Sequence, residues 1–156
     1  MLRRQALDAD NVLAAAKFRE DAEEILKGLC SQSRSPYPFH TLAALYLDEI
    51  DLSVKHVIDS GGVWPTSRNF ENSIKKTEKT LNKALAYFPE DDHLRALEAR
   101  LADKLKDTPK ALDVLRAANN NNPHEEYIAI RYARLLISQS DLETAEKVLR
   151  LSLIHI

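Results

Sequence analysis

The sequence predicts an all-α fold in which antiparallel helix pairs stack into a solenoid, and three observations support this prediction. The last two-fifths of the chain repeat at a spacing of 34 residues, a period typical of helix–turn–helix units that bury their apolar faces by stacking. Only three of the 156 residues are glycine, and abundant Ala, Leu, Glu, Lys and Arg favour helix throughout. Prolines and acidic residues recur where helices should begin. The 34-residue register is kept by Leu81, Leu115 and Leu149, by Pro89 and Pro123, by Ala99 and Ala133, and by Ala111 and Ala145.

The first expected element is an N-terminal helix at 10–35. Ala22, Ile25, Leu26 and Leu29 indicate that this segment is one more helix. This helix fits the second half of an earlier unit.

Residues 36–89 fit an irregular helix pair that carries an insertion at 47–68. The insertion is expected to lengthen the first helix to about Ile58 and to add a loop at 60–65. The apolar positions of the two helices are Phe39, Leu42, Ala43 and Tyr46, followed by Thr77, Leu81 and Ala84.

Two regular units follow at 90–123 and 124–152. Each first helix is preceded by a proline and opens with acidic residues, which the positive end of a helix dipole favours. Ser140 to Glu143 form a capping-box pattern that opens the last helix. The four helices are expected at 92–106, 109–119, 125–138 and 141–152, with apolar stripes that share one core with 40–50 and 70–87.

The two regular units resemble the tetratricopeptide repeat, most specifically over 90–150. That family places small residues midway along the first helix, early in the second and near its end, with an acidic residue at the turn and a closing proline. The resemblance implies one helical-repeat domain over 1–156 with the right-handed superhelix of that family. The large aromatic residue that often opens the first helix is replaced by Arg95 and Ala129. The matching residues are Ala99 and Ala133, Asp107 and Asp141, Ala111 and Ala145, Leu115 and Leu149, Ala118 and Ser152, and Pro89 and Pro123.

The last six residues, 151–156, read Leu-Ser-Leu-Ile-His-Ile, which a transposase-adapter sequence used in DNA library preparation encodes in one reading frame. We interpret them as a non-native tail on a fragment of a longer chain. The alternative is that Leu151 and Ser152 simply continue the last helix. A repeat array without a polar capping helix agrees with a fragment.

Charge and composition limit the partners. Lys plus Arg is 22 against 24 for Asp plus Glu, a net charge of −2, so there is no electrostatic case for nucleic acid or an anionic membrane. No apolar run reaches the ~18 residues of a membrane span, and the N-terminus lacks the apolar stretch of a signal peptide. The single cysteine, Cys30, allows no internal disulfide and fits a reducing compartment. We therefore expect a cytoplasmic protein.

No set of residues indicates catalysis, a cofactor or a metal site, so we expect none of these. A thiol–imidazole pair between Cys30 and His40 would need the fold to bring them together across two prolines, and a lone cysteine at a helix end usually packs. His93 and His124 each lie beside acidic residues, but in turns where polar residues are expected anyway.

Two other features of the sequence need an interpretation, a single tryptophan and a run of lysines. Trp64, the only tryptophan, either plugs the inserted loop onto the helix ends or anchors a partner. Lys75, Lys76, Lys79 and Lys83 form a basic stripe, which we interpret mainly as a solvated face with ion pairs one turn apart.

The resemblance also identifies a concave groove, in which the first helices of this family hold extended peptides. Arg100 and Arg134 are 34 residues apart, so stacking should bring both guanidinium groups to one face, where they could fork onto carboxylates of a bound segment. The alternative is that they pair with nearby acids such as Glu98 or Asp103, or lie in water. The Asn and Lys set with which some members clamp a C-terminal carboxylate is absent. The other groove positions are His40, Ala44, His93, Ala96, Lys104, Tyr127, Ile130 and Ile137.

The leading interpretation is therefore a non-enzymatic scaffold that binds a partner protein or peptide, with acidic segments favoured, in a mildly basic concave groove. The alternative is a regulatory or sensor arm of a larger bacterial protein, such as a signalling ATPase, whose catalytic domain lies outside this segment. A nucleotide-binding or hydrolase domain upstream in the full reading frame would favour the arm.

Overall fold

The computed structural model describes residues 2–62, 64–65 and 67–153. All regular structure within these residues is helical. The helices are α1 (Leu2–Gln32), α2 (Tyr37–Asp59), α3 (Arg68–Tyr87), α4 (Asp92–Lys104), α5 (Thr108–Asn121), α6 (Glu126–Ser138) and α7 (Leu142–Leu153).

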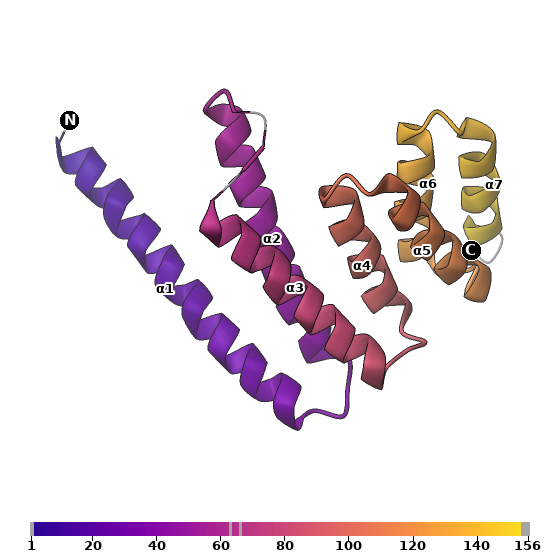
Figure 1. The fold of residues 1–156 in the computed structure, drawn as a ribbon, viewed down its shortest axis with the longest axis horizontal. Coiled ribbons are helices and arrows are strands. Elements are labelled where there is room, and N and C mark those ends of the chain that lie inside the picture. The colour runs from indigo at the N-terminus through magenta and orange to yellow at the C-terminus, as the bar shows by residue number, and fades with distance from the viewer. Residues whose placement is uncertain (1, 63, 66, 154–156) are drawn as a thin grey trace.

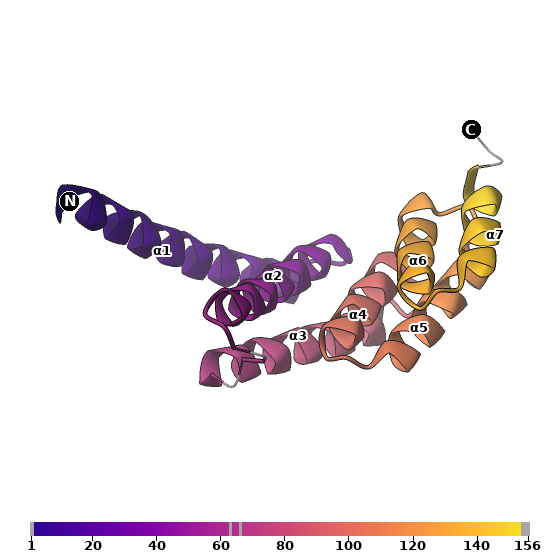
Figure 2. The ribbon, with the colours of Figure 1, turned by 90° about the horizontal axis from the view of Figure 1, so that it is seen from above.

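The helices form a row in which each one packs against the next (Figure 1). Successive helices run in opposite directions, and α1 and α7 lie at opposite ends of the row in both views (Figures 1 and 2). The expectation of an all-α fold with packed neighbouring helices is confirmed, and this arrangement is compatible with a helical repeat.

The helix bounds follow the expectations from the sequence closely after residue 36. The four helices of the repeat region begin and end within two residues of the expected positions, and α2 extends through Ile58 to Asp59. The N-terminal helix differs, because α1 spans Leu2–Gln32 and not 10–35. No glycine or proline interrupts residues 2–9, whereas Pro36 disfavours helix at the residue before it. Of the proposed tail, 154–156 lie outside the described residues.

The turns that end α4 and α6 have the same geometry 34 residues apart. Lys106 and Ser140 both adopt the left-handed backbone conformation, with φ of 65° and 64°. The backbone N–H of the following residue then donates to the carbonyl of Ala102 at 2.9 Å in the first turn and of Leu136 at 3.0 Å in the second. Such bonds satisfy carbonyls at a helix end that have no partner within the helix.

Aspartates begin the helices that follow these turns and also α4. The carboxylates of Asp91, Asp107 and Asp141 each accept the backbone N–H three residues further on, at 2.8, 3.2 and 3.1 Å. An aspartate in this position satisfies an amide that the helix itself leaves unbonded. The repeated acids in the sequence therefore act as helix caps.

The first helix of each pair lies on a shared face. α2 contacts α4 and α4 contacts α6, whereas no contact among the described residues joins α3 to α5 or α5 to α7. We call the face formed by α2, α4 and α6 the inner face. Any surface that extends across several units must therefore lie here.

Alanines allow the helices to pack closely. Ala99 and Ala133, midway along α4 and α6, are each 1% exposed, and Ala111 and Ala145 in the second helices are 0% and 2% exposed. Larger side chains at such positions would overpack the core. The 34-residue alanine register thus marks the places where neighbouring helices approach each other.

Trp64 lies partly buried in the α2–α3 loop. Its ring meets Phe70 of α3 edge to face, with the ring centroids 5.5 Å apart, and packs against the core that α1 to α4 share. This placement agrees with the plug interpretation.

Replacing Trp64 with alanine is expected to lower the free energy of unfolding by about 1–2 kcal/mol. This is less than the ~3–5 kcal/mol for a fully buried tryptophan, because part of the ring is already exposed. Urea denaturation followed by circular dichroism measures the change, and Trp64→Phe is the control because it keeps a ring against Phe70. An unchanged midpoint of urea denaturation would instead support the interpretation of Trp64 as an anchor for a partner.

Candidate interaction groove

A ladder of stacked rings crosses the inner face from α2 to α6. Its rings belong to Tyr37, His40, His93 and Tyr127, with successive centroids 5.7, 5.5 and 5.0 Å apart. The guanidinium carbon of Arg131 lies 4.6 Å from the Tyr127 centroid, a cation–π contact. We call these five residues the ring ladder. A hollow of about 300 Å³ beside it, the ring hollow, is lined by His40, Thr41, Ala44, His93, Leu97 and Tyr127.

His40 ties the ladder to the beginning of α4. Its Nε2 lies 2.7 Å from Oδ1 of Asp91, the same oxygen that accepts the backbone N–H of Leu94. The imidazole is therefore held by the residue that caps the helix carrying His93. His93 is exposed, whereas its two ring neighbours are partly buried. His93 is thus an exposed ring within the ladder, and Tyr37 is exposed at its α2 end.

Carboxylates gather where α4 meets the ladder. Burial raises the pKa of Asp92, and the carboxylates of Asp91 and Glu125 raise it further, while a hydrogen bond with Asn122 and the charge of His93 oppose the shift.

Arg100 is held by two carboxylates of α2. One of its terminal nitrogens lies 2.8 Å from Oδ1 of Asp48 and 2.7 Å from Oδ2 of Asp51, and Nζ of Lys104 lies 2.7 Å from Oδ1 of Asp51. Burial raises the pKa of Asp51, but the hydrogen bonds from Lys104 and Arg100 outweigh it and hold the pKa below 3.8. We call these four residues the α2–α4 ion-pair cluster, in which two positive charges compensate two negative ones.

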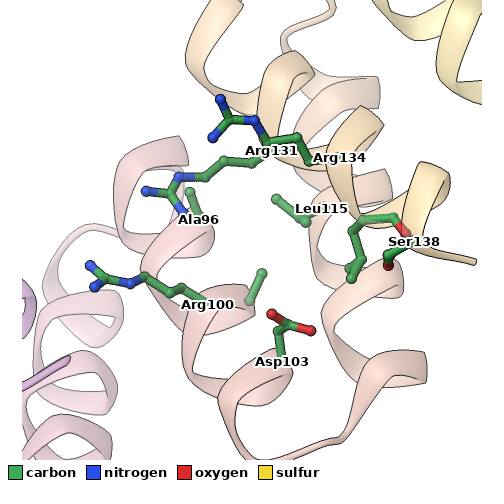
Figure 3. Close-up of a pocket in the computed structure, with 9 residues that line it drawn as sticks. Ala96, Arg100, Asp103, Leu115, Arg131, Arg134 and Ser138 are labelled. Atoms are coloured by element: carbon green, nitrogen blue, oxygen red, sulfur yellow. Dashed lines mark hydrogen bonds between the residues drawn. The ribbon is translucent and has the colours of Figure 1, made fainter. Parts of the chain in front are cut away.

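A second hollow of about 300 Å³, the basic hollow, lies between α4 and α6 (Figure 3). Arg131 and Arg134 lie at one end of it and Asp103 at the other (Figure 3). Arg134 is exposed and forms no ion pair with any residue that the structure describes. Nε of Arg131 is buried and likewise has no hydrogen-bond partner in the described part of the chain. Because the charge of Arg100 is compensated by α2, the two arginines of α6 face a single carboxylate, and the hollow is net positive.

The two arginines that the repeat register pairs, Arg100 and Arg134, do line the same hollow. Their surroundings differ, however, because the Arg100 charge is compensated and that of Arg134 is not. The acids that pair with Arg100 come from α2, and not from the nearby Glu98 or Asp103. Glu98 instead pairs with Arg95.

The other residues that the sequence assigns to partner binding lie in four places. His93 and Tyr127 stack in the ring ladder. Lys104 belongs to the α2–α4 ion-pair cluster. Ile130 is partly buried on α6 and lines neither hollow, and Trp64 packs on α3.

The lysine stripe of α3 does more than form a solvated face. Lys76 pairs with Glu23 of α1 at 3.0 Å, and Lys83 lies 5.9 Å from the ring centroid of Phe39 of α2. Two of the four lysines therefore contact other helices, and not the acids one turn away on α3.

Several residues of the groove are missing from the expectations based on the sequence, among them Tyr37 of the ring ladder. Arg131 follows Tyr127 by one helical turn, and this spacing could have revealed the pair. Asp48 and Asp51 continue the inner face of α2 beyond Ala44, but they lie in the insertion, where the repeat register no longer applies.

Among the described residues, no group of three His, Cys, Asp or Glu side chains could hold a metal ion. No helix in the same part of the chain combines the length and apolar character needed to cross a membrane. In the candidate thiol–imidazole pair of the sequence, burial raises the pKa of the Cys30 thiol, and the His40 imidazole contacts the Asp91 carboxylate.

No protein-family model matches this sequence, and no curated protein matches it.

Proposed function

We propose that this chain is a non-enzymatic protein-interaction module built from tetratricopeptide-like units, and that its inner face binds an extended segment of a partner protein. The observation that carries the proposal is the continuity of this face: three first helices place a ladder of rings beside a hollow with two uncompensated arginines. Recognition groups spread along a line in this way suit an extended chain.

The tetratricopeptide geometry itself is supported by the repeat in the turns. The left-handed residues Lys106 and Ser140, and the capping residues Asp107 and Asp141, recur at the 34-residue period. The right-handed superhelix, the cytoplasmic location and the bacterial origin stay predictions that rest on the sequence.

The charges favour an acidic segment. Arg131 and Arg134 present guanidinium groups that can donate paired hydrogen bonds to a carboxylate, and such charge-assisted bonds are among the strongest in proteins. Arg100 and Lys104 are engaged by Asp48 and Asp51, so we assign the anion-binding role to the arginines of α6.

The test is a selection from a displayed library of random 12-residue peptides, followed by calorimetric titration of the enriched peptides. Replacing both Arg131 and Arg134 with alanine is expected to weaken binding at least tenfold, because each charge-assisted hydrogen bond contributes ~1.5–3 kcal/mol. Binding should also weaken as salt rises, since the rim of the groove is open to solvent.

The matched control removes two charges from another surface. Lys147 and Arg150 lie exposed on α7 and pair only along that helix, with Glu143 and Glu146. The Lys147→Ala, Arg150→Ala variant should keep wild-type affinity. No enrichment of any peptide, or equal affinities for the two double variants, would contradict the proposal.

A further inference from the structure

Two rings of the ring ladder are exposed, Tyr37 and His93, and of these His93 lines the ring hollow. His93 is exposed and lies between His40 and Tyr127, which are partly buried, so its outer edge can take another ring in an edge-to-face or offset contact. The ring hollow beside it is lined by these rings together with Thr41, Ala44 and Leu97. A planar, largely apolar side chain fits this lining better than a charged one does.

The basic hollow requires a different ligand group. Nε of Arg131 is buried without a partner in the described part of the chain, and a buried donor is costly to leave unpaired. Arg134 lies one turn further along α6. The two uncompensated guanidinium groups are suited to a carboxylate, which their terminal nitrogens can bind.

Tyr127 and Arg131 join the two hollows, because the guanidinium of Arg131 lies on the Tyr127 ring. Along α6, a rise of ~1.5 Å per residue separates Tyr127 from Arg131 by ~6 Å and from Arg134 by ~10 Å. An extended segment advances ~3.3 Å per residue, so two residues cover ~6.6 Å and three cover ~10 Å. By this axial spacing, a ring beside Tyr127 and a carboxylate on Arg131 or Arg134 are two or three residues apart in an extended segment.

We infer that the partner segment carries an aromatic residue two or three positions from an aspartate or glutamate, with the ring on His93 and Tyr127 and the carboxylate on Arg131 and Arg134. This inference rests on the proposed function and specifies the ligand of the same groove.

A ladder of rings beside arginines is also a shape that can stack the bases of a single-stranded nucleic acid. The net charge of the chain is −2, which gives no general attraction for the phosphate groups. The observations therefore favour a protein segment over a nucleic acid.

The test uses fluorescein-labelled peptides with blocked ends and the whole chain. The parent peptide is Ser-Gly-Tyr-Ser-Glu-Glu-Ser-Gly, which has glutamates two and three positions after the tyrosine. One matched peptide replaces tyrosine with alanine, and a second replaces both glutamates with glutamine. A third, Tyr-Ser-Gly-Ser-Gly-Ser-Glu-Glu, keeps the composition but separates the glutamates from the tyrosine by six and seven positions. Reversed sequences cover the opposite chain direction, and a ten-nucleotide oligouridine tests the nucleic-acid alternative. Fluorescence anisotropy up to millimolar protein measures affinity.

Each matched peptide is expected to bind at least tenfold more weakly than the parent in its better direction. His93→Ala should abolish the preference for tyrosine over alanine and keep the preference for glutamate over glutamine. Replacing both Arg131 and Arg134 with alanine should do the reverse. Because His93 is exposed, its replacement should leave the melting temperature unchanged.

Equal affinities across the peptide series, or no binding of the parent at millimolar protein, would overturn the inference. If the selected library peptides still bind through Arg131 and Arg134 but lack the ring–acid pair, the inference fails and the proposed function stands. If those peptides do not depend on these arginines either, both fail. Tighter binding of oligouridine than of the parent peptide, lost in the arginine variant, would replace the protein segment with a nucleic acid.

Discussion

Tyr46→Ala is expected to lower the free energy of unfolding by ~3–5 kcal/mol, the cost of removing a buried aromatic side chain. Tyr46 is 1% exposed and lies in the core that α1 to α4 share. Its hydroxyl donates to Oε1 of Glu23 on α1 at 3.0 Å, and Nζ of Lys76 on α3 lies 5.2 Å from its ring centroid. One side chain of α2 thus joins three helices, and its loss should weaken the attachment of α1.

Tyr46→Phe separates the ring from the hydroxyl group. It keeps the packing and removes only the hydrogen bond to Glu23, so it should cost about 1 kcal/mol. Urea denaturation measures both variants, and hydrogen exchange at residues 22–32 reports whether α1 opens on its own. If the two variants were equally stable, the stability that Tyr46 contributes would come from its hydroxyl group and not from its buried ring.

Glu23 makes this junction dependent on pH. Burial raises the pKa of Glu23, but hydrogen bonds from Lys27, Lys76 and Tyr46 outweigh it and hold the pKa below 4.5. A carboxyl group whose pKa is lower in the folded state stabilises the fold above its unfolded pKa, and this contribution is lost as the pH falls through the folded value. The attachment of α1 should therefore weaken only in acid below about pH 4.5.

The sequence predicts the repeat region well because its signals are local. An aspartate cap, a left-handed turn residue and an alanine at a close approach each act within one helix or one turn. Asp107 and Asp141, and Ala99 and Ala133, accordingly occupy the structural positions that the 34-residue register implies. Helix bounds follow directly from such positions.

Contacts between distant segments are harder to predict. The repeat register brings Arg100 and Arg134 to one hollow, but it contains no information about α2 beyond residue 46, where the insertion begins. The charges that engage Arg100 come from this insertion, at Asp48 and Asp51. The sequence therefore predicts the face on which an arginine lies but not whether its charge is available.

Because the charge of Arg100 is engaged within the fold, replacing Arg100 should change the stability of the chain and not its partner binding. Arg100→Ala is expected to lower the free energy of unfolding by about 2–3 kcal/mol. The value lies above the ~0.2–1 kcal/mol of exposed ion pairs and below the ~3–5 kcal/mol of buried ones, since the Arg100 side chain is 19% exposed and that of Asp51 33%. Arg100→Asp should cost more, because it adds a third carboxylate beside Asp48 and Asp51.

A charge swap tests whether the Arg100 variants lose stability because the α2–α4 ion-pair cluster is broken. Adding Asp51→Arg to Arg100→Asp should recover part of the lost stability, whereas Asp51→Arg alone should not stabilise the chain. The stability difference between wild type and Asp51→Asn should shrink in acid below pH 3.8, because the low pKa of Asp51 confines its contribution to higher pH.

The affinity of Arg100→Ala for the selected peptides, measured where the variant is still folded, should match wild type. A loss of affinity as large as that of the Arg131 and Arg134 variant would instead mean that a ligand displaces Asp48 and Asp51 from Arg100, and that the anion-binding part of the groove extends to α4.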